Sequence, residues 1–285
     1  MQRQKSYDDT PTLYLVPTPI GNLEDMTYRA VNILKSVNVI FSEDTRVTRQ
    51  LLNYFEINKK LISNHEHNEF VVKEKIEDEL KNGNSVALVS DRGTPAISDP
   101  GLVAAKYIIE KGYNVVCLPG SNALIPAVVM SGLDTKPFMF YGFLNSKKTK
   151  QVEELESLKY IESTLIFYEA PHRLKSTLTT IKEILGNRNI ALVREISKLH
   201  EEVIRAKISE VLEVVDSLKG EFVIIVDKYY KEQETFDDLT ILEHVKKYIN
   251  EGFNEKDAIK KVAKIRGVIK IEIYKEYHKD WWVWN

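Results

Sequence analysis

The sequence contains a single cysteine, Cys117, among its 285 residues. One thiol excludes a framework of internal disulfides and leaves no set of thiolates for a structural zinc site. Cys117 lies in the apolar run 114–118, which is typical of a short strand. We therefore expect Cys117 to behave as a small buried hydrophobic residue.

Long apolar runs are also missing from the chain. Residues 1–12 are polar and lack the apolar centre of a signal peptide, and no later run approaches the ~20 residues that a membrane-spanning helix needs. We expect no membrane segment and a cytoplasmic location.

Neither sign of charge dominates, since 40 Lys and Arg face 42 Asp and Glu and give a net charge of −2. This balance argues against a protein that coats nucleic acid through bulk charge. Residues 239–280 hold ten basic and seven acidic residues, so this segment is one candidate region for contact with RNA. The chain also lacks the Gly-x-Gly-x-x-Gly fingerprint and the Walker lysine loop, which removes the best support for dinucleotide or triphosphate binding.

Strand-like and helix-like segments alternate through the first half of the chain. This alternation is typical of βαβ units and of a largely parallel sheet. Beyond residue 138 the last strands lie close together in sequence, which predicts a mixed sheet. We expect two α/β domains, residues 1–134 and 135–230, and a small helical C-terminal domain, residues 236–285.

The C-terminal segment follows a charged stretch, residues 228–238, that resembles a linker. Three short helices are expected at 239–250, 255–265 and 269–277. Asn254 is placed to cap the second helix and Gly267 to end it. These helices are either a bundle that shields the second domain or a helix-turn-helix-like appendage that contacts RNA. The tryptophan-rich end, Trp281 to Trp284, is expected to dock on the protein or on a dimer partner.

Four short segments rich in Gly, Pro and Asp follow the predicted strands of the first half. They span residues 17–22, 42–46, 90–101 and 119–123. Open α/β sheets bind their ligands at the carboxyl ends of the strands. The four segments are therefore expected to converge on one crevice, which is the candidate active site.

Individual side chains in these segments have distinct expected roles. Asp91 stands at a strand end, where its carboxylate can accept hydrogen bonds from a ligand. Asp99, directly before Pro100, is expected to cap the next helix. Ser121 is either a helix cap or a ligand donor. His65 and His67 form only a weak metal pattern, and a polar loop is the better interpretation.

Two further segments, 167–173 and 194–200, follow strands of the second half. Each gathers charges that would be costly on a buried face unless they were paired. They are either part of a functional site or a paired structural network, and the sequence leaves both interpretations open.

Five motifs occur in collinear order between Leu13 and Asp227. They are Leu-Tyr-Leu-Val-Pro-Thr-Pro-Ile-Gly-Asn-Leu-Glu-Asp from residue 13, Ser-Glu-Asp-Thr-Arg from 42, Ser-Asp-Arg-Gly-Thr-Pro-Ala-Ile-Ser-Asp-Pro-Gly from 90, Pro-Gly-Ser-Asn-Ala from 119 and Phe-Tyr-Glu-Ala-Pro-His-Arg from 167. With these motifs the chain closely resembles the ribosomal RNA small subunit methyltransferase I family of the tetrapyrrole methylase superfamily, also called class III methyltransferases. One departure is Ile269, which stands where a Ser or Thr helix cap is expected.

The resemblance implies an enzyme, usually a homodimer, that binds S-adenosylmethionine between two α/β domains. The implied reaction is methylation of the 2′-hydroxyl of a cytidine ribose in the decoding region of small-subunit (16S) ribosomal RNA. The RNA is expected within the assembled small subunit, and the sequence leaves free RNA open as the alternative substrate. The residues expected to line the cofactor site are Ile20, Asp91, Thr94, Ala96, Ile97, Ser121, Asn122 and Ala123, with Tyr168 and Phe222 near the adenine.

The resemblance also places residues 42–46, 167–173 and 194–198 toward the RNA. Removing the proton of a ribose hydroxyl requires a base, and the candidates are Glu43, Glu195 and Lys198. Arg46, Arg173 and Arg194 are the candidates for holding phosphates and the developing alkoxide. This scheme requires no metal.

Two alternatives stay open on the sequence. The same fold and cofactor serve acceptors such as a tetrapyrrole carbon or a protein side chain, although the Arg, Glu and Lys clusters weigh against a tetrapyrrole pocket. The other alternative is a noncatalytic ribosome-assembly factor that retains the fold.

Overall fold

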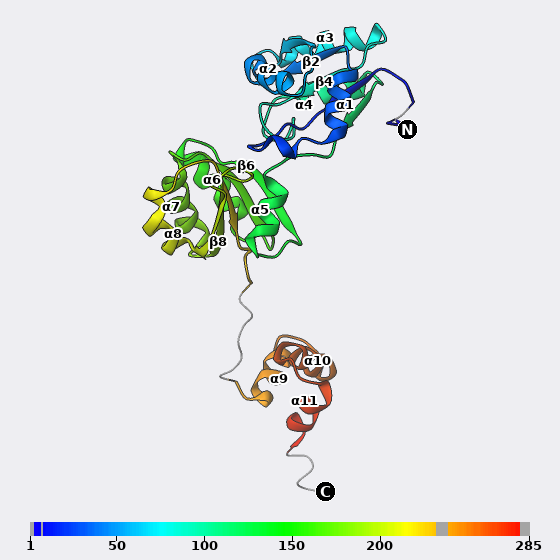
Figure 1. Ribbon diagram of the computed structural model, residues 1–285. Helices are drawn as coiled ribbons and strands as arrows, with labels where there is room; N and C mark the ends of the chain where they lie inside the picture. The colour runs from blue at the N-terminus through cyan, green and yellow to red at the C-terminus, as the bar shows by residue number, and fades with distance from the viewer. Residues whose placement is uncertain (1–2, 7, 232–238, 280–285) are drawn as a thin grey trace. The chain divides into compact units, whose positions relative to one another are not determined.

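A computed structural model describes residues 3–6, 8–231 and 239–279 (Figure 1). The chain divides into two compact units, residues 1–229 and 230–285. The predicted docking of Trp281 to Trp284 and most of the predicted linker, residues 232–238, lie outside the described residues. The three-domain division therefore stays a prediction.

The first sheet has the strand order β3-β2-β4-β1-β5, and every neighbouring pair is parallel. Its strands are β1 (Thr12–Leu15), β2 (Val39–Ser42), β3 (Lys60–Ser63), β4 (Val86–Val89) and β5 (Asn114–Cys117). The helices between them are α1 (Tyr28–Ser36), α2 (Thr45–Tyr54), α3 (Glu69–Lys81) and α4 (Leu102–Glu110), after a short 3-10 turn, η1 (Leu23–Asp25). The prediction of a largely parallel sheet is confirmed.

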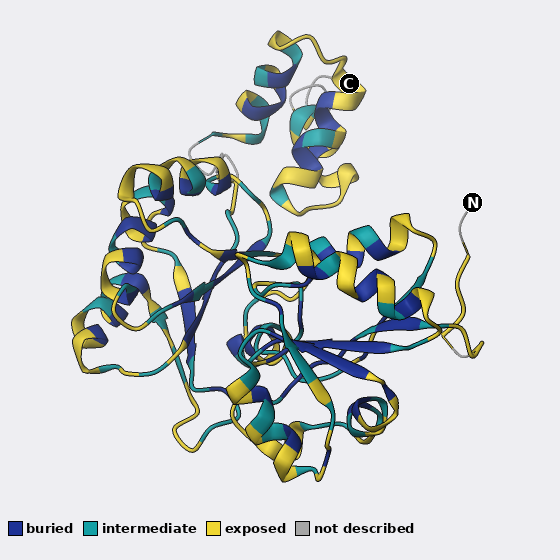
Figure 2. Cartoon of the chain, turned by 90° about the horizontal axis from the view of Figure 1, so that it is seen from above, coloured by how far each residue is buried: buried dark blue, intermediate teal, exposed yellow. Residues whose placement is uncertain are grey.

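Successive strand residues of this sheet point to opposite faces, and both faces are buried. Leu13, Phe41 and Leu88 belong to one buried cluster, whereas Ile40 and Ala87 belong to the other. Because side chains alternate along a strand, continuous apolar strands require helices on both sides. Figure 2 shows strands of both sheets mostly in the buried colour and helices with exposed outer faces.

The second sheet has the order β6-β7-β10-β8-β9 and is mixed, as predicted. Strands β6 (Phe138–Phe143) and β7 (Thr164–Glu169) are parallel, while β10 (Phe222–Val226), β8 (Asn189–Arg194) and β9 (Glu202–Lys207) join by antiparallel pairs. Helices α6 (Lys148–Leu158), α7 (Leu174–Leu185) and α8 (Ile208–Val214) and the turn η2 (Val215–Ser217) complete the layer.

Helix α5 (Leu124–Ser131) follows the last strand of the first sheet but packs on the second sheet. Its buried residues Ala127 and Val128 cluster with Ile166, Val193 and Ile225. The chain therefore passes from the first sheet to the second through residues 119–123.

The C-terminal unit contains α9 (Ile241–Asn250), α10 (Glu255–Arg266) and α11 (Lys270–Tyr277) around a core of their own side chains. Asn254 caps α10 by accepting the amide of Asp257, and Gly267 ends it in the left-handed conformation, both as predicted. Ile269 precedes α11 and makes no side-chain cap, as its apolar side chain dictates.

Two expectations from the sequence are wrong. Cys117 is exposed, because it ends β5 at the edge of the first sheet. Asp99 does not cap α4, which begins three residues later with Gly101 as its N-cap and no side-chain cap.

Candidate active site

The four loop segments predicted to converge are joined by hydrogen bonds at the carboxyl edge of the first sheet. Thr18 and Gly93 exchange two backbone hydrogen bonds of 2.9 Å, and Thr94 Oγ1 donates to the carbonyl of Ser121 at 3.1 Å. The amide of Asp44 donates to Asp91 Oδ1 at 2.9 Å. The predicted convergence is therefore confirmed.

The loops approach each other so closely that one position requires glycine. A Cβ atom on Gly120 would lie 2.8 Å from the Cβ of Pro17. Real Cβ atoms essentially never make non-bonded contacts this short, so the absence of a side chain at Gly120 lets the two loops meet.

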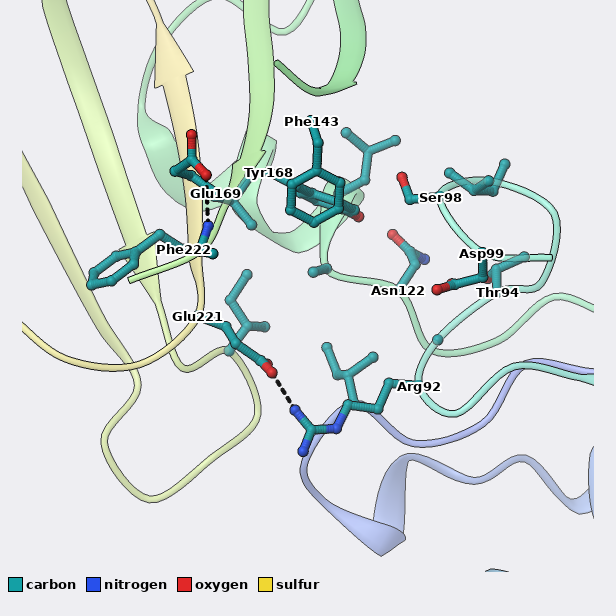
Figure 3. Close-up of a pocket in the computed structure, with 18 of the residues that line it drawn as sticks. Arg92, Thr94, Ser98, Asp99, Asn122, Phe143, Tyr168, Glu169, Glu221 and Phe222 are labelled. Carbon is teal, nitrogen blue, oxygen red and sulfur yellow. Dashed lines mark hydrogen bonds and ion pairs between the residues drawn. The ribbon is translucent and has the colours of Figure 1, made fainter. Parts of the chain in front are cut away.

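A cavity of about 580 Å³ lies beside these loops and continues to the second sheet (Figure 3). Its volume falls within the range of small-molecule sites. Most of the wall is apolar, and the polar groups are few. The lining residues are Ile20, Arg92, Gly93, Thr94, Ile97, Ser98, Asp99, Asn122, Ala123, Leu124, Ile125, Phe143, Tyr168, Glu169, Ala170, Pro171, Ile196, Glu221, Phe222 and Val223.

Most of the predicted cofactor residues line this cavity. Those that do are Ile20, Thr94, Ile97, Asn122, Ala123, Tyr168 and Phe222. The other three, Asp91, Ala96 and Ser121, are not among the lining residues. Asp91 holds the amide of Asp44, while the Ser121 hydroxyl donates to the carbonyl of Asp25 at 3.0 Å. Ser121 is not the cap of α5, because the Asn122 side chain accepts the amide of Ile125 instead.

Aromatic side chains form the wall on the second sheet. The ring of Tyr168 lies 4.9 Å from that of Phe140 and 5.6 Å from that of Phe143, both edge to face. Burial, reinforced by the charge of Asp99, raises the pKa of Tyr168 to about 12. Its phenol is therefore a neutral hydroxyl at physiological pH.

Asp99 lines the cavity, which the sequence interpretation missed. Burial, with the nearby charges of Glu43 and Asp91, raises the pKa of Asp99 to about 6. The Asp-Pro-Gly sequence is typical of a helix start, so local sequence favoured a cap. Asp99 lies in the same predicted site loop as Asp91, and this shared loop is the sequence feature that indicates a place for Asp99 in the site.

The predicted catalytic residues of the first sheet lie outside the lining. Glu43 accepts the Asp91 amide at 3.4 Å, and burial raises its pKa despite that hydrogen bond. Arg46 is 88% exposed and forms an ion pair of 2.6 Å with Asp44, the N-cap of α2.

Arg173 and Arg194 form ion pairs and hydrogen bonds with residues of the second sheet and its loops. Arg173 Nε lies 3.3 Å from Glu169 Oε1, and its guanidinium donates to the carbonyl of Leu144 at 2.7 Å. Arg194 pairs with Glu202 and donates to the carbonyl of Lys219 at 3.0 Å. Both contacts are of the kind expected for a paired structural network.

Glu195 and Lys198 belong to a charged network that reaches the first sheet. Lys198 Nζ lies 3.0 Å from Glu195 Oε1 and 2.9 Å from Glu221 Oε2, and Glu221 also pairs with Arg92. Burial opposes both charges, yet the hydrogen bonds outweigh it, so the pKa of Glu195 is lowered and that of Lys198 is raised.

Metal binding has no support in the parts of the chain that the structure describes. Within them no group of three His, Cys, Asp or Glu side chains could hold a metal ion. A search of the same residues also finds no helix with the length and apolarity to cross a membrane.

Comparison with known proteins agrees with this architecture. The family model of the tetrapyrrole (corrin/porphyrin) methylases matches residues 12–212. The crystal structure of uroporphyrin-III C-methyltransferase from Thermus thermophilus has a TM-score of 0.53 at 18% identity and covers 76% of this chain and 94% of its own. The fold is thus that of a class III methyltransferase.

Curated relatives identify the branch of that class. A ribosomal RNA small subunit methyltransferase I of Bacillus subtilis is 49% identical over 98% of this chain and 99% of its own length. The protein of the same name from Halalkalibacterium halodurans is 46% identical over 98% of this chain and its own full length. The chain belongs to the ribosomal RNA small subunit methyltransferase I family, and methyl transfer is its class of reaction.

Proposed function

We propose that this chain transfers a methyl group from S-adenosylmethionine to the 2′-hydroxyl of a cytidine ribose in the decoding region of small-subunit ribosomal RNA. The observation that carries the proposal is the largely apolar cavity between the two sheets, in a chain that shares 45–49% identity with relatives named for this RNA.

The chemistry of the wall fits the cofactor. A flat heterocycle needs apolar and aromatic surfaces such as Ile97, Phe143 and Phe222, while a ribose and an amino-acid tail need a few polar groups. Thr94, Asn122 and Tyr168 offer those groups. S-adenosylmethionine supplies, when bound, a methyl group already activated by a sulfonium.

The remaining task of the protein is to orient the acceptor and remove its proton. Holding a ribose hydroxyl in line with the methyl group replaces a bimolecular encounter with a positioned one. Exposed basic groups such as Arg46 are suited to hold RNA phosphates, and they lie near the loops that surround the cavity.

Several finer points belong to the same proposal. The substrate is the assembled small subunit, the enzyme is a homodimer, and it acts in the cytoplasm. The domains are residues 1–134, 135–230 and 236–285. Arg173 and Arg194 act by shaping the RNA-facing loops, since their guanidinium groups are held by Glu169 and Glu202.

The decisive experiment is methyl transfer in vitro. Small subunits from a strain that lacks this enzyme are incubated with the full chain and labelled donor, and ribose methylation is mapped by nucleotide. A single methylated cytidine ribose in the decoding region is expected. Base methylation, or transfer only to a tetrapyrrole or a protein, would contradict the proposal.

Calorimetry with S-adenosylmethionine separates an enzyme from a binding factor. Binding without transfer to any subunit or RNA would favour a different acceptor. Absence of binding would favour a noncatalytic assembly factor.

A further inference from the structure

Three carboxylates line the cavity, and two of them are already satisfied by protein groups. Glu169 accepts the Thr177 hydroxyl at 2.5 Å and the Ala170 amide at 2.8 Å. Glu221 pairs with Arg92 and Lys198. The carboxylate of Asp99 forms no hydrogen bond or ion pair with any residue that the structure describes.

The geometry points to Asp99 as the general base that takes the proton of the acceptor hydroxyl, an inference that rests on the proposed function. In Figure 3 its carboxylate faces the interior of the cavity beside Asn122, toward the wall that holds Tyr168. A carboxylate without a protein partner at that place is available to a ligand group.

The loop that carries Asp99 is held at both ends. Thr94 Oγ1 ties it to the carbonyl of Ser121 at 3.1 Å, and the amide of Gly101 donates to Glu69 Oε1 at 2.5 Å. Pro100 fixes the backbone directly after Asp99. A base held in this way needs little reorganisation when the acceptor arrives.

The surroundings also give Asp99 a useful proton affinity. Burial and the charges of Glu43 and Asp91 raise its pKa to about 6, and the neutral phenol of Tyr168 faces it across the cavity. A base is most effective when its pKa lies near the working pH, because it is then deprotonated and still basic.

The base candidates proposed from sequence are less well placed. Glu195 and Lys198 are paired with each other, which lowers the pKa of the first and raises that of the second. Lys198 is therefore protonated at neutral pH. Glu43 accepts the Asp91 amide, and none of the three lines the cavity.

The step balances without a further reactant. The ribose oxygen bonds to the methyl carbon, the electron pair of the broken carbon–sulfur bond goes to sulfur, and the hydroxyl proton passes to Asp99. That proton leaves to water after the product dissociates.

The first test is Asp99→Asn in the full chain, assayed on small subunits at saturating donor. General-base catalysis contributes roughly 100- to 10,000-fold, so a loss of at least about 100-fold is expected, with donor affinity by calorimetry unchanged within about twofold. Asp78→Asn is the matched control, since Asp78 is 71% exposed on α3. It should keep the wild-type rate.

Two outcomes of this test overturn the inference. One is an Asp99→Asn variant that works at the wild-type rate while the wild-type enzyme methylates the cytidine. The other is a variant that binds the donor weakly but turns over normally at saturation, which would make Asp99 a donor ligand. Failure of the wild-type enzyme to methylate the subunit would instead refute the proposed function.

Two further measurements distinguish a base from a structural residue. Formate should partly restore the rate of Asp99→Ala, where the side chain has left space, and should not accelerate the wild-type enzyme. The carbon-13 signal of the Asp99 carboxyl, assigned by its disappearance in Asp99→Asn, should titrate near pH 6. Absence of formate rescue together with titration near pH 4 would overturn the assignment.

Discussion

Arg92, which follows β4 of the first sheet, forms an ion pair with Glu221, which precedes β10 of the second (Figure 3). Both residues line the cavity, so the pair connects its two walls. Their side chains are 55% and 60% exposed, which places the pair among those that add little to stability.

A double-mutant cycle of Arg92→Gln and Glu221→Gln tests whether the pair acts as a unit on donor binding. Each single variant should weaken donor affinity by up to about fivefold, since an exposed pair contributes at most about 1 kcal/mol. The double variant should be no weaker than either single variant. Calorimetry measures all four affinities, and strictly multiplicative losses would contradict the coupling.

Asp99→Asn should make the protein more stable at pH 7.5. The folded pKa of about 6 exceeds the ordinary aspartate value of 3.8, so the folded state binds this proton more tightly than the unfolded state. The stability of the wild type therefore falls as pH rises from about 4 to about 6 and stays lower above that window.

The expected gain for Asp99→Asn is about 1 kcal/mol at pH 7.5, after discounting for the partial exposure of Asp99. Urea denaturation at pH 7.5 and at pH 3.5 measures it, and the difference should disappear at the lower pH. Equal stability of the two proteins at pH 7.5 would show that the Asp99 charge carries no burial penalty.

Asp91→Ala should weaken binding of S-adenosylmethionine, although Asp91 does not line the cavity. Its carboxylate holds the Asp44 amide at the start of α2 and lies in the loop that carries Thr94 and Asp99. A hydrogen bond to a charged group contributes about 1.5 to 3 kcal/mol to stability, so its removal should loosen this loop. Calorimetry measures the affinity, and an unchanged value would exclude Asp91 from the support of the site.

Arg173→Ala should destabilise the protein by about 2 kcal/mol, because it leaves the buried carboxylate of Glu169 without its guanidinium partner. Lys175→Ala is the control, since Lys175 lies in the first turn of α7 and Arg173 is the N-cap of that helix. The ion pair of Lys175 with Asp216 is solvent exposed and should be worth less than about 1 kcal/mol. Denaturant midpoints compare the two.

The same Arg173→Ala variant should turn over RNA more slowly with unchanged donor affinity, since its loop is predicted to face the RNA. Assay below the unfolding transition separates this effect from lost stability. Normal turnover by the folded variant would remove Arg173 from the site.

Gly21→Ala should displace Lys198, because a Cβ atom at residue 21 would clash with Lys198 Cγ. The displacement breaks the ion pairs of Lys198 with Glu195 and Glu221, and we expect a loss of about 1 kcal/mol in unfolding free energy. Adding Lys198→Ala removes the clash. The loss of unfolding free energy in the double variant should therefore be smaller than the sum of the losses in Gly21→Ala and Lys198→Ala. Additive losses would indicate that no contact exists.

Much of the fold could be predicted because apolar periodicity records which faces are buried. Strand β3 is hard to predict from sequence because it is a short edge strand whose residues, Lys60 to Ser63, are exposed or only half-buried. An edge strand needs no apolar alternation, so its sequence resembles a loop. The exposure of Cys117 has a similar cause at the opposite edge of the sheet.

The site could be predicted only in part. The loops of the first sheet carry dense Gly, Pro and Asp motifs, and most of the cofactor residues named from them line the cavity. The position of Asp99 depends on where α4 begins, and local sequence does not fix that residue. Glu221 was missed because a glutamate before a strand carries no motif, and its partners Arg92 and Lys198 come from distant segments.

The seven buried apolar side chains in the described part of the C-terminal unit all come from α9, α10 and α11. Among the residues that the structure describes, the core clusters of the two sheets include none beyond Val226. Truncation after Tyr229 therefore removes no described member of the core clusters of the two sheets. The role of the C-terminal unit can therefore be tested genetically. The shortened gene and the full-length gene are introduced separately into one deletion strain, and their ability to complement it is compared.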